Sequence, residues 1–164
     1  MPINPVVIES FSGSYRFLSN FYPSFVTYEG LTYPSVEHAF QAAKTHDQAI
    51  REEFSRLDKS PGQAKMDGGR LRLRPDWEQV KLKVMEELLR LKFAPGTHLA
   101  EKLLSTGNSV LIEGNTWNDQ FWGVANGSGL NHLGLLLMEI RTSLHGLAQQ
   151  KPCSQFSKKE NFPQ

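Results

Sequence analysis

A carboxylate, an amide and an amine recur at helical spacing after Ser35. Glu37, Gln41 and Lys44 fall four and then three residues apart, so a helix beginning near Ser35 places all three on one face. The apolar residues between them predict a second stripe that faces the core. Such a row of acid, amide and amine can form the wall of an active site. It can equally be an ordinary solvated helix face.

A second polar cluster combines two tryptophans and two carboxylates with small residues. Its members are Glu113, Asn115, Trp117, Asn118, Asp119, Trp122, Gly123 and Asn126. Aromatic rings beside hydrogen-bonding groups suit a flat heterocycle, because a base can stack on a ring while amides and carboxylates bind its edge or its ribose. The alternative is that the two tryptophans cover the hydrophobic core under a long loop.

Arginine alternates with leucine at Arg70, Arg72 and Arg74. In an extended segment this alternation places the three guanidinium groups on one side, where their forks suit phosphate oxygens. Arg16, near an aromatic turn, is a further candidate for binding phosphate. The same pattern is also typical of a solvated strand edge.

Several common chemistries lack their motifs in this chain. The five histidines form no HExxH helix and have no cysteine partners, which argues against a zinc site. The phosphate-binding and dinucleotide glycine loops are absent, and so is the G-x-S-x-G elbow. A net charge of +1 argues against a duplex-binding surface over the whole domain. With one cysteine, Cys153, and no apolar run of about 20 residues, we expect a soluble, cytoplasmic protein.

The elements that must position these residues are mainly helices. N-cap residues and apolar periodicity predict helices that begin near residues 36, 48, 61, 77, 98 and 132, the one at 77 being the longest. Asp76 and Asn131 are the expected caps of the fourth and sixth helices. Residues 25–33 predict a β-hairpin and residues 109–113 a buried strand. Residues 115–129 form a loop long enough to suggest a function.

The chain of 164 residues is long enough for one domain that folds without disulfides or metals. We expect this domain to comprise residues 1–146. Residues 147–164 are polar and lack apolar periodicity, so we expect a disordered tail.

Several blocks of the sequence resemble the NADAR, or YbiA-like, family. They are Phe17–Pro23, Tyr33–His38 with Gln41 and Lys44, Arg74–Trp77, Asp119–Gly123 and Asn131–Gly134. The blocks follow the family's order and cover about residues 11–145. The resemblance implies a compact, mainly α-helical α+β domain with a short N-terminal β-hairpin region and a small additional strand.

The same resemblance implies an N-glycosidase, a hydrolase of ribosylated heterocycles. In some members the substrate is a phosphoribosylamino-pyrimidine intermediate of riboflavin synthesis, such as 5-amino-6-(5-phosphoribosylamino)uracil. In others it is ADP-ribose attached to guanine in nucleic acid. Two alternatives from other classes are a non-catalytic sensor of NAD-derived ligands or ADP-ribose, and a helical partner-binding protein.

Cleavage of an N-glycosidic bond passes through an oxocarbenium-like state that a nearby carboxylate stabilises. We expect Glu37 to be that carboxylate, Lys44 to donate a proton or form a Schiff base, and Asp119 to bind ribose hydroxyls. The expected substrate-binding residues are Arg16, Asn20, Phe21, His38, Gln41, Arg70, Arg74, Trp77, Trp122, Gly123 and Asn131. No metal or organic cofactor is expected, because side chains can supply the acid, the base and the electrostatics. The expected partner is a ribosyl-phosphate or ADP-ribosyl small molecule, or an ADP-ribosylated nucleic acid.

Overall fold

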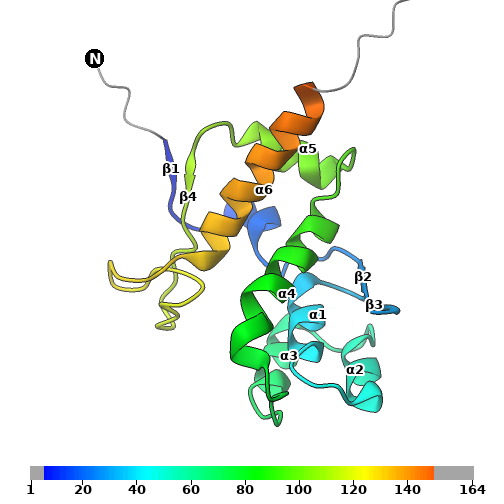
Figure 1. Ribbon diagram of the computed structural model, residues 1–164. Coiled ribbons are helices and arrows are strands. Elements are labelled where there is room, and N and C mark those ends of the chain that lie inside the picture. Colours follow the sequence, from blue (N-terminus) through cyan, green and yellow to red (C-terminus); the bar gives the residue numbers. More distant parts are fainter. Residues whose placement is uncertain (1–5, 150–164) are drawn as a thin grey trace, which may run out of the picture.

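The computed structural model describes residues 6–149, which fold mainly into helices. The elements in chain order are β1 (Val7–Ile8), the 3-10 helix η1 (Gly13–Leu18), β2 (Val26–Tyr28), β3 (Leu31–Tyr33), α1 (Val36–Ala42), α2 (Gln48–Phe54), α3 (Pro61–Gly68), α4 (Trp77–Lys92), α5 (His98–Ser105), β4 (Val110–Leu111) and α6 (His132–Gln149). Figure 1 shows α4 in the middle, with α1 and α6 in contact with it on opposite sides. The predicted mainly α-helical α+β class is confirmed.

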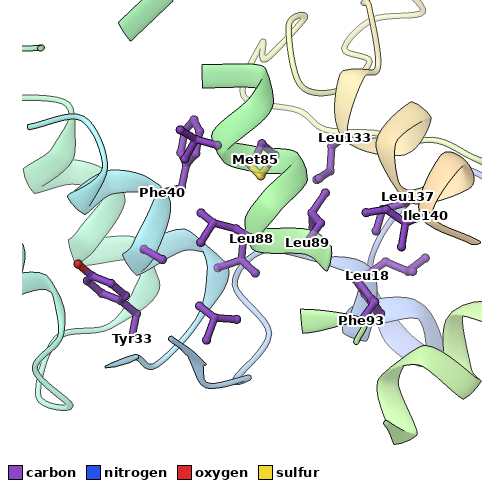
Figure 2. Packing of buried hydrophobic residues seen from close by; sticks show 14 of the residues in the cluster. Leu18, Tyr33, Phe40, Met85, Leu88, Leu89, Phe93, Leu133, Leu137 and Ile140 are labelled. Carbon is purple, nitrogen blue, oxygen red and sulfur yellow. The ribbon is translucent and has the colours of Figure 1, made fainter. Parts of the chain in front are cut away.

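Helix α4 forms the centre of the hydrophobic core. Its residues Met85, Leu88 and Leu89 are at most 1% exposed. Figure 2 shows these side chains between Phe40 of α1 on one side and Leu133 of α6 on the other. Burying a large aliphatic side chain stabilises the fold by roughly 1.5–3 kcal/mol. The contacts of α4 therefore fix the position of α1, which carries the first predicted cluster.

Helix α1 begins where the sequence predicts. The hydroxyl of Ser35 accepts a hydrogen bond from the backbone N–H of His38, so the expected N-cap is confirmed. All seven residues of the helix are buried, including Glu37 and Gln41. These two polar residues are therefore enclosed, which contradicts the alternative of a solvated helix face.

The predicted β-hairpin is confirmed. Strands β2 and β3 pair antiparallel, with Val26 opposite Tyr33. The two turn residues, Glu29 and Gly30, both have positive φ angles, of 46° and 84°. Positive φ angles at both turn residues are typical of the two-residue turns whose twist matches the right-handed twist of the flanking strands.

The predicted strand at residues 109–113 is shorter than expected. Only Val110–Leu111 is extended in a ladder, and it pairs in parallel with Val7–Ile8. The sequence did not predict β1, because a strand of two residues carries no alternation of apolar and polar residues.

Two expectations about helices need correction. Asp76 is the N-cap residue of α4, as predicted, but its carboxylate makes no capping bond. It accepts two hydrogen bonds from the Arg74 guanidinium instead, at 2.6 and 2.8 Å. The longest helix is α6 with 18 residues, against 16 for α4.

The expected domain boundary at residue 146 lies inside a helix. Helix α6 continues to Gln149, and the rest of the predicted tail, residues 150–164, lies outside the described residues. In the described part of the chain, each helix is too short or too polar to cross a membrane.

Candidate active site

A cavity of about 630 Å³ opens between α1, α3, α4 and the loop that joins β4 to α6. Its lining residues are Ser19, Asn20, Phe21, Glu37, Phe40, Gln41, Lys44, Gly62, Lys65, Gly69, Met85, Glu113, Trp117, Asp119 and Trp122. The two predicted polar clusters, 69 or more residues apart in the sequence, thus face one space. The volume lies within the range of roughly 300–1,000 Å³ that is typical of small-molecule sites.

Glu37 is the most buried carboxylate of this cavity, at 6% exposed. One carboxylate oxygen accepts a hydrogen bond of 2.7 Å from the side-chain amide of Gln41. Burial raises the pKa of Glu37, while the Gln41 hydrogen bond and the positive charges of Lys65 and Lys44 partly oppose that rise. The backbone N–H of Glu37 donates to the carbonyl of Asn20, which fixes the segment after η1 against α1.

Lys44 lies just beyond the end of α1. Its ammonium group donates to the carbonyl of Gly68 at 3.4 Å. Burial lowers the pKa of Lys44, and the nearby Glu37 carboxylate opposes that shift. Gly68 also packs closely on Gln41, since a Cβ at this position would lie 2.0 Å from the Gln41 side-chain oxygen. Helix α3 can therefore approach the polar side of α1 only with glycine here.

The loop after β4 is organised around Asp119. The side-chain amide of Asn115 donates to the Asp119 carbonyl at 2.8 Å. One carboxylate oxygen of Asp119 accepts from the backbone N–H groups of Phe121 and Trp122, at 3.1 and 2.9 Å. These bonds hold the carboxylate at the cavity wall and aim the indole of Trp122 toward the core.

Trp122 contributes an aromatic wall. Its ring meets the ring of Phe40 edge-on, with 5.3 Å between centroids. Phe40 also packs on Trp77, which is buried beneath it with 5.1 Å between the ring centroids. Trp122 lines the cavity and packs on the core, whereas Trp117 is 60% exposed, so the idea that both tryptophans only cover the core is wrong.

Glu113 is a third carboxylate of the cavity. Burial and the neighbouring charges of Asp119 and Glu37 raise its pKa to about 7, although Lys65 opposes the shift. Sequence reasoning placed Glu113 in the second cluster but gave it no catalytic role. The sequence signal for such a role was its position between a predicted buried strand and a glycine-rich loop.

Three lining residues carry a buried acceptor atom without a hydrogen-bond partner among the described residues. These atoms are Asn20 Oδ1, Gln41 Oε1 and Glu113 Oε2. An unsatisfied buried acceptor costs roughly 1–3 kcal/mol, so such groups usually serve a ligand or water. All three atoms are enclosed, and the Gln41 oxygen lies against Gly68.

Lys65 and Met85 line the cavity although the sequence did not suggest them. Lys65 lies on the polar helix α3, whose pattern does not distinguish a site residue from a solvated one. Met85 accepts a weak hydrogen bond from the Asn20 side-chain amide at 3.5 Å. Its place in a run of core residues gave no sign of this contact.

The predicted phosphate-binding arginines do not line the cavity. Arg74 is held by Asp76. Arg16 and Arg70 are exposed, Arg16 on η1 and Arg70 beyond the end of α3. Residues 70–74 are irregular and pair with no strand in the described structure, which contradicts the alternative of a solvated strand edge. Their part in substrate binding stays a prediction.

His38 and Trp77 are buried beside the cavity wall and do not line it. The two ring nitrogens of His38 bond the Ser35 hydroxyl and the Lys59 carbonyl, both at 2.8 Å. Burial lowers the pKa of His38. Both residues are in positions to fix α1, and direct contact with a substrate stays a prediction for each.

Gly123 and Asn131 support Glu113 from behind. A Cβ at Gly123 would lie 2.2 Å from the Glu113 carbonyl, so the loop can return against the end of β4 only with glycine here. The side chain of Asn131 accepts from the Glu113 N–H at 3.0 Å and donates to the Leu111 carbonyl at 2.9 Å. Asn131 directly precedes α6, as predicted, and its carbonyl accepts from the Leu135 N–H, but its side chain bonds the end of β4 instead of the first turn of the helix.

The described residues contain no group of three or more His, Cys, Asp or Glu side chains placed to hold a metal ion. The cavity instead combines carboxylates, amides, lysines and aromatic rings. Such a set can bind a heterocycle and a sugar and can move protons between them.

Residues 9–145 match the family described as the NADAR domain. The chain belongs to the NADAR family. N-glycosidase YbiA of Shigella flexneri is 42% identical over 137 residues, which cover 82% of this chain and 85% of that protein. A solved NMR structure of E. coli YbiA superposes with a TM-score of 0.81 at 37% identity and covers 93% of both chains. The suspected family and its fold are thereby confirmed.

A third relative differs in length. The riboflavin biosynthesis protein of Vibrio vulnificus is 36% identical over 133 residues, which cover 80% of this NADAR chain and 36% of that protein. The curated full-length relatives of similar size are named N-glycosidases. This NADAR protein is accordingly a hydrolase of N-glycosidic bonds.

Proposed function

We propose that this chain hydrolyses the N-glycosidic bond of a phosphoribosylamino-pyrimidine such as 5-amino-6-(5-phosphoribosylamino)uracil. The observation that carries the proposal is the meeting of Glu37, Glu113 and Asp119 with Lys44 in one cavity beside aromatic rings. A relative named as a riboflavin biosynthesis protein supports the choice of substrate class.

Glu37 stabilises the positive charge that develops on the ribose ring as the C1–N bond breaks. As a carboxylate it also takes a proton from the water that attacks C1. Its hydrogen bond from Gln41 leaves the second oxygen available for this task. The burial that raises its pKa also strengthens its interaction with a cation in the water-poor cavity.

Glu113 supplies the proton for the leaving group. A carboxyl group with a pKa of about 7 is substantially protonated at neutral pH. It donates that proton to the departing nitrogen while Glu37 gains one from water, and exchange with solvent restores both groups. The Gln41 hydrogen bond and the charge of Lys44 favour the ionised form of Glu37, which supports giving Glu37 the role of base and Glu113 that of acid.

Lys44 has two roles open to it. Its ammonium group can hydrogen-bond the sugar or the leaving group. Because burial lowers its pKa, its neutral amine is also more accessible than that of an exposed lysine, which suits attack on the anomeric carbon of the opened sugar. Reduction with borohydride during turnover distinguishes the two, since only a Schiff base is trapped as a stable adduct.

The remaining polar groups fit recognition of the sugar and base. Asp119 and Asn20 present oxygen acceptors that suit ribose hydroxyls. The rings of Phe21 and Trp122 suit stacking with a pyrimidine.

Removal of ADP-ribose from guanine is the second candidate. It requires room for a second phosphate and an adenine, and the 60% exposed Trp117 at the cavity wall offers a ring on which an adenine can stack. A non-catalytic sensor would bind the same ligands without turnover.

The test compares 5-amino-6-(5-phosphoribosylamino)uracil and guanine-linked ADP-ribose side by side. Release of ribose 5-phosphate from the first, at a rate well above that of ADP-ribose release from the second, is the expected result. Faster release of ADP-ribose would instead select the second candidate. Tight binding of either compound without turnover would contradict both enzyme proposals and favour the sensor.

A further inference from the structure

Charge is unevenly distributed between the deep and the exposed parts of the cavity. Glu37 and Gln41 are 6% and 4% exposed and mark its deep part. Lys65 and Trp117 are exposed and mark its mouth. A phosphate carries up to two negative charges, and a carboxylate-rich interior repels it. The phosphate of a substrate should therefore lie at the mouth, while its sugar and base reach the carboxylates.

Lys65 is the lysine placed at that mouth. Its ammonium nitrogen lies 5.8 Å from the ring centroid of Phe21 and 5.4 Å from that of Trp117. These rings belong to two segments that line the cavity, one after η1 and the other in the loop after β4. Within residues 6–149 Lys65 forms no ion pair, whereas Lys59 is paired with Asp67 at 2.7 Å.

The other cations nearby are less suited to a phosphate. Lys44 is buried deeper and its ammonium group already donates to the Gly68 carbonyl. Arg74 is bound by Asp76. Arg70 and Arg72 do not line the cavity. Among the cavity-lining residues that the structure describes, Lys65 is thus the exposed cation with no direct ion pair or hydrogen bond, although its charge also acts at longer range on Glu37 and Glu113.

We propose that Lys65 binds the 5′-phosphate of the ribosyl substrate and makes the site select phosphorylated over dephosphorylated ribosides. The inference rests on the proposed function and adds a specificity residue to it. The phosphate would replace the two aromatic rings as the partner of the ammonium group. A hydrogen-bonded ion pair between lysine and phosphate is far stronger than an exposed cation–π contact.

The experiment measures kcat/KM for the phosphorylated substrate and for the same riboside without its phosphate. In the unmodified protein we expect a preference of about 10- to 100-fold for the phosphorylated form, the range for a hydrogen bond to a charged group. Lys65→Met should abolish most of this preference by lowering kcat/KM for the phosphorylated form alone. Lys65→Arg should retain much of it.

Lys83→Met is the matched control, because Lys83 is an exposed lysine of α4 outside the cavity lining. It should leave the preference unchanged. A Lys65→Met protein that keeps the full preference would overturn the inference. So would an Arg70→Met protein that loses it, since that result would assign the phosphate to the arginine segment.

Calorimetric binding of ribose 5-phosphate and ribose makes the test independent of turnover. Lys65→Met should weaken binding of ribose 5-phosphate by about 10-fold or more and leave the weak binding of ribose unchanged. This result in a protein that cleaves no substrate would uphold the phosphate site while the proposed function fails. Equal affinity of Lys65→Met and the unmodified protein for ribose 5-phosphate would overturn the site itself.

Discussion

The carboxyl groups of Glu37 and Glu113 have different surroundings within the same cavity. Glu37 is bonded by Gln41 and lies near two lysines, while Glu113 has an unpartnered buried oxygen and two acidic neighbours. Burial raises the pKa of both, and for Glu113 it reaches about 7. Lys65 and Asp119 act on both groups, whereas the Gln41 hydrogen bond and the charge of Lys44 act on Glu37 and favour its ionised form, as the proposed base requires.

Glu113→Gln tests the proposed acid through the pH profile. Glu113 loses its proton as the pH rises through about 7, so the rate of the unmodified protein should fall above that pH. Glutamine cannot donate the proton, and we expect a rate at pH 6 lower by about 100-fold and a profile without that alkaline limb. Rates are measured from pH 5 to 9.

Lys92 provides the control for this profile. Its pKa is also lowered to about 7 by burial, yet its side chain does not line the cavity. Lys92→Met should retain the alkaline limb. If Glu113→Gln keeps the limb and Lys92→Met loses it, Glu113 is not the acid.

At the scale of elements, sequence reasoning succeeded where a local signal decides the structure. Ser35 and Ser60 cap α1 and α3 as their types predict, and the Glu29–Gly30 turn closes the expected hairpin. It failed at Asp76, because the nearby Arg74 competes for the carboxylate that would otherwise cap α4. Competition between partners depends on the folded geometry, which spacing alone does not give.

The residues of the candidate site also differ in whether a local signal or the folded geometry places them. Glu37 and Gln41 were predictable because their hydrogen bond follows from helical spacing. Lys65 was not, because it reaches the cavity through the packing of α3 on α1. That packing depends on Gly68, which looked in the sequence only like the end of a helix.

Gly68→Ala tests this packing of α3 on α1. The added Cβ would lie 2.0 Å from the Gln41 side-chain oxygen and 2.8 Å from its Cβ, so Gln41 must move and its bond to Glu37 is disturbed. We expect a loss of about 1–3 kcal/mol in the free energy of unfolding. Denaturant unfolding measures this loss, and activity should fall with it.

Gly146→Ala is the matched substitution in α6. No atom lies within 4 Å of a Cβ there, so alanine should stabilise the helix by about 0.5–1 kcal/mol. Equal stability of the Gly68→Ala and unmodified proteins would show that the close contact of α3 with Gln41 is not required.

At the scale of the whole molecule, Lys92 connects the end of α4 to the start of the site. It is 3% exposed, and its ammonium group donates to the Ser19 carbonyl at 2.7 Å. Ser19 and the following Asn20 line the cavity. The hydrogen bond gives this buried group a polar partner, but burying its charge still costs stability.

This buried lysine predicts how stability changes with pH. The unfolded chain keeps the Lys92 proton up to about pH 10.5, whereas the folded protein releases it near pH 7. Between these values the unfolded state binds more protons, so this group makes stability rise with pH. From pH 7 to 9 the unmodified protein should gain roughly 2 kcal/mol relative to Lys92→Met. Denaturant unfolding measures the free energy of unfolding at each pH. If it changes equally in the two proteins from pH 7 to 9, Lys92 is not the source of this pH dependence.

The measurement that tests the account most directly is the rate of ribose 5-phosphate release from 5-amino-6-(5-phosphoribosylamino)uracil by the unmodified protein and by Glu37→Gln. Glu53→Gln, on the exposed side of α2, is the matched control. We predict that Glu37→Gln lowers the rate by about 100- to 10,000-fold while Glu53→Gln leaves it unchanged. A Glu37→Gln protein that folds and cleaves the substrate within a few-fold of the unmodified rate would contradict the central role of this carboxylate.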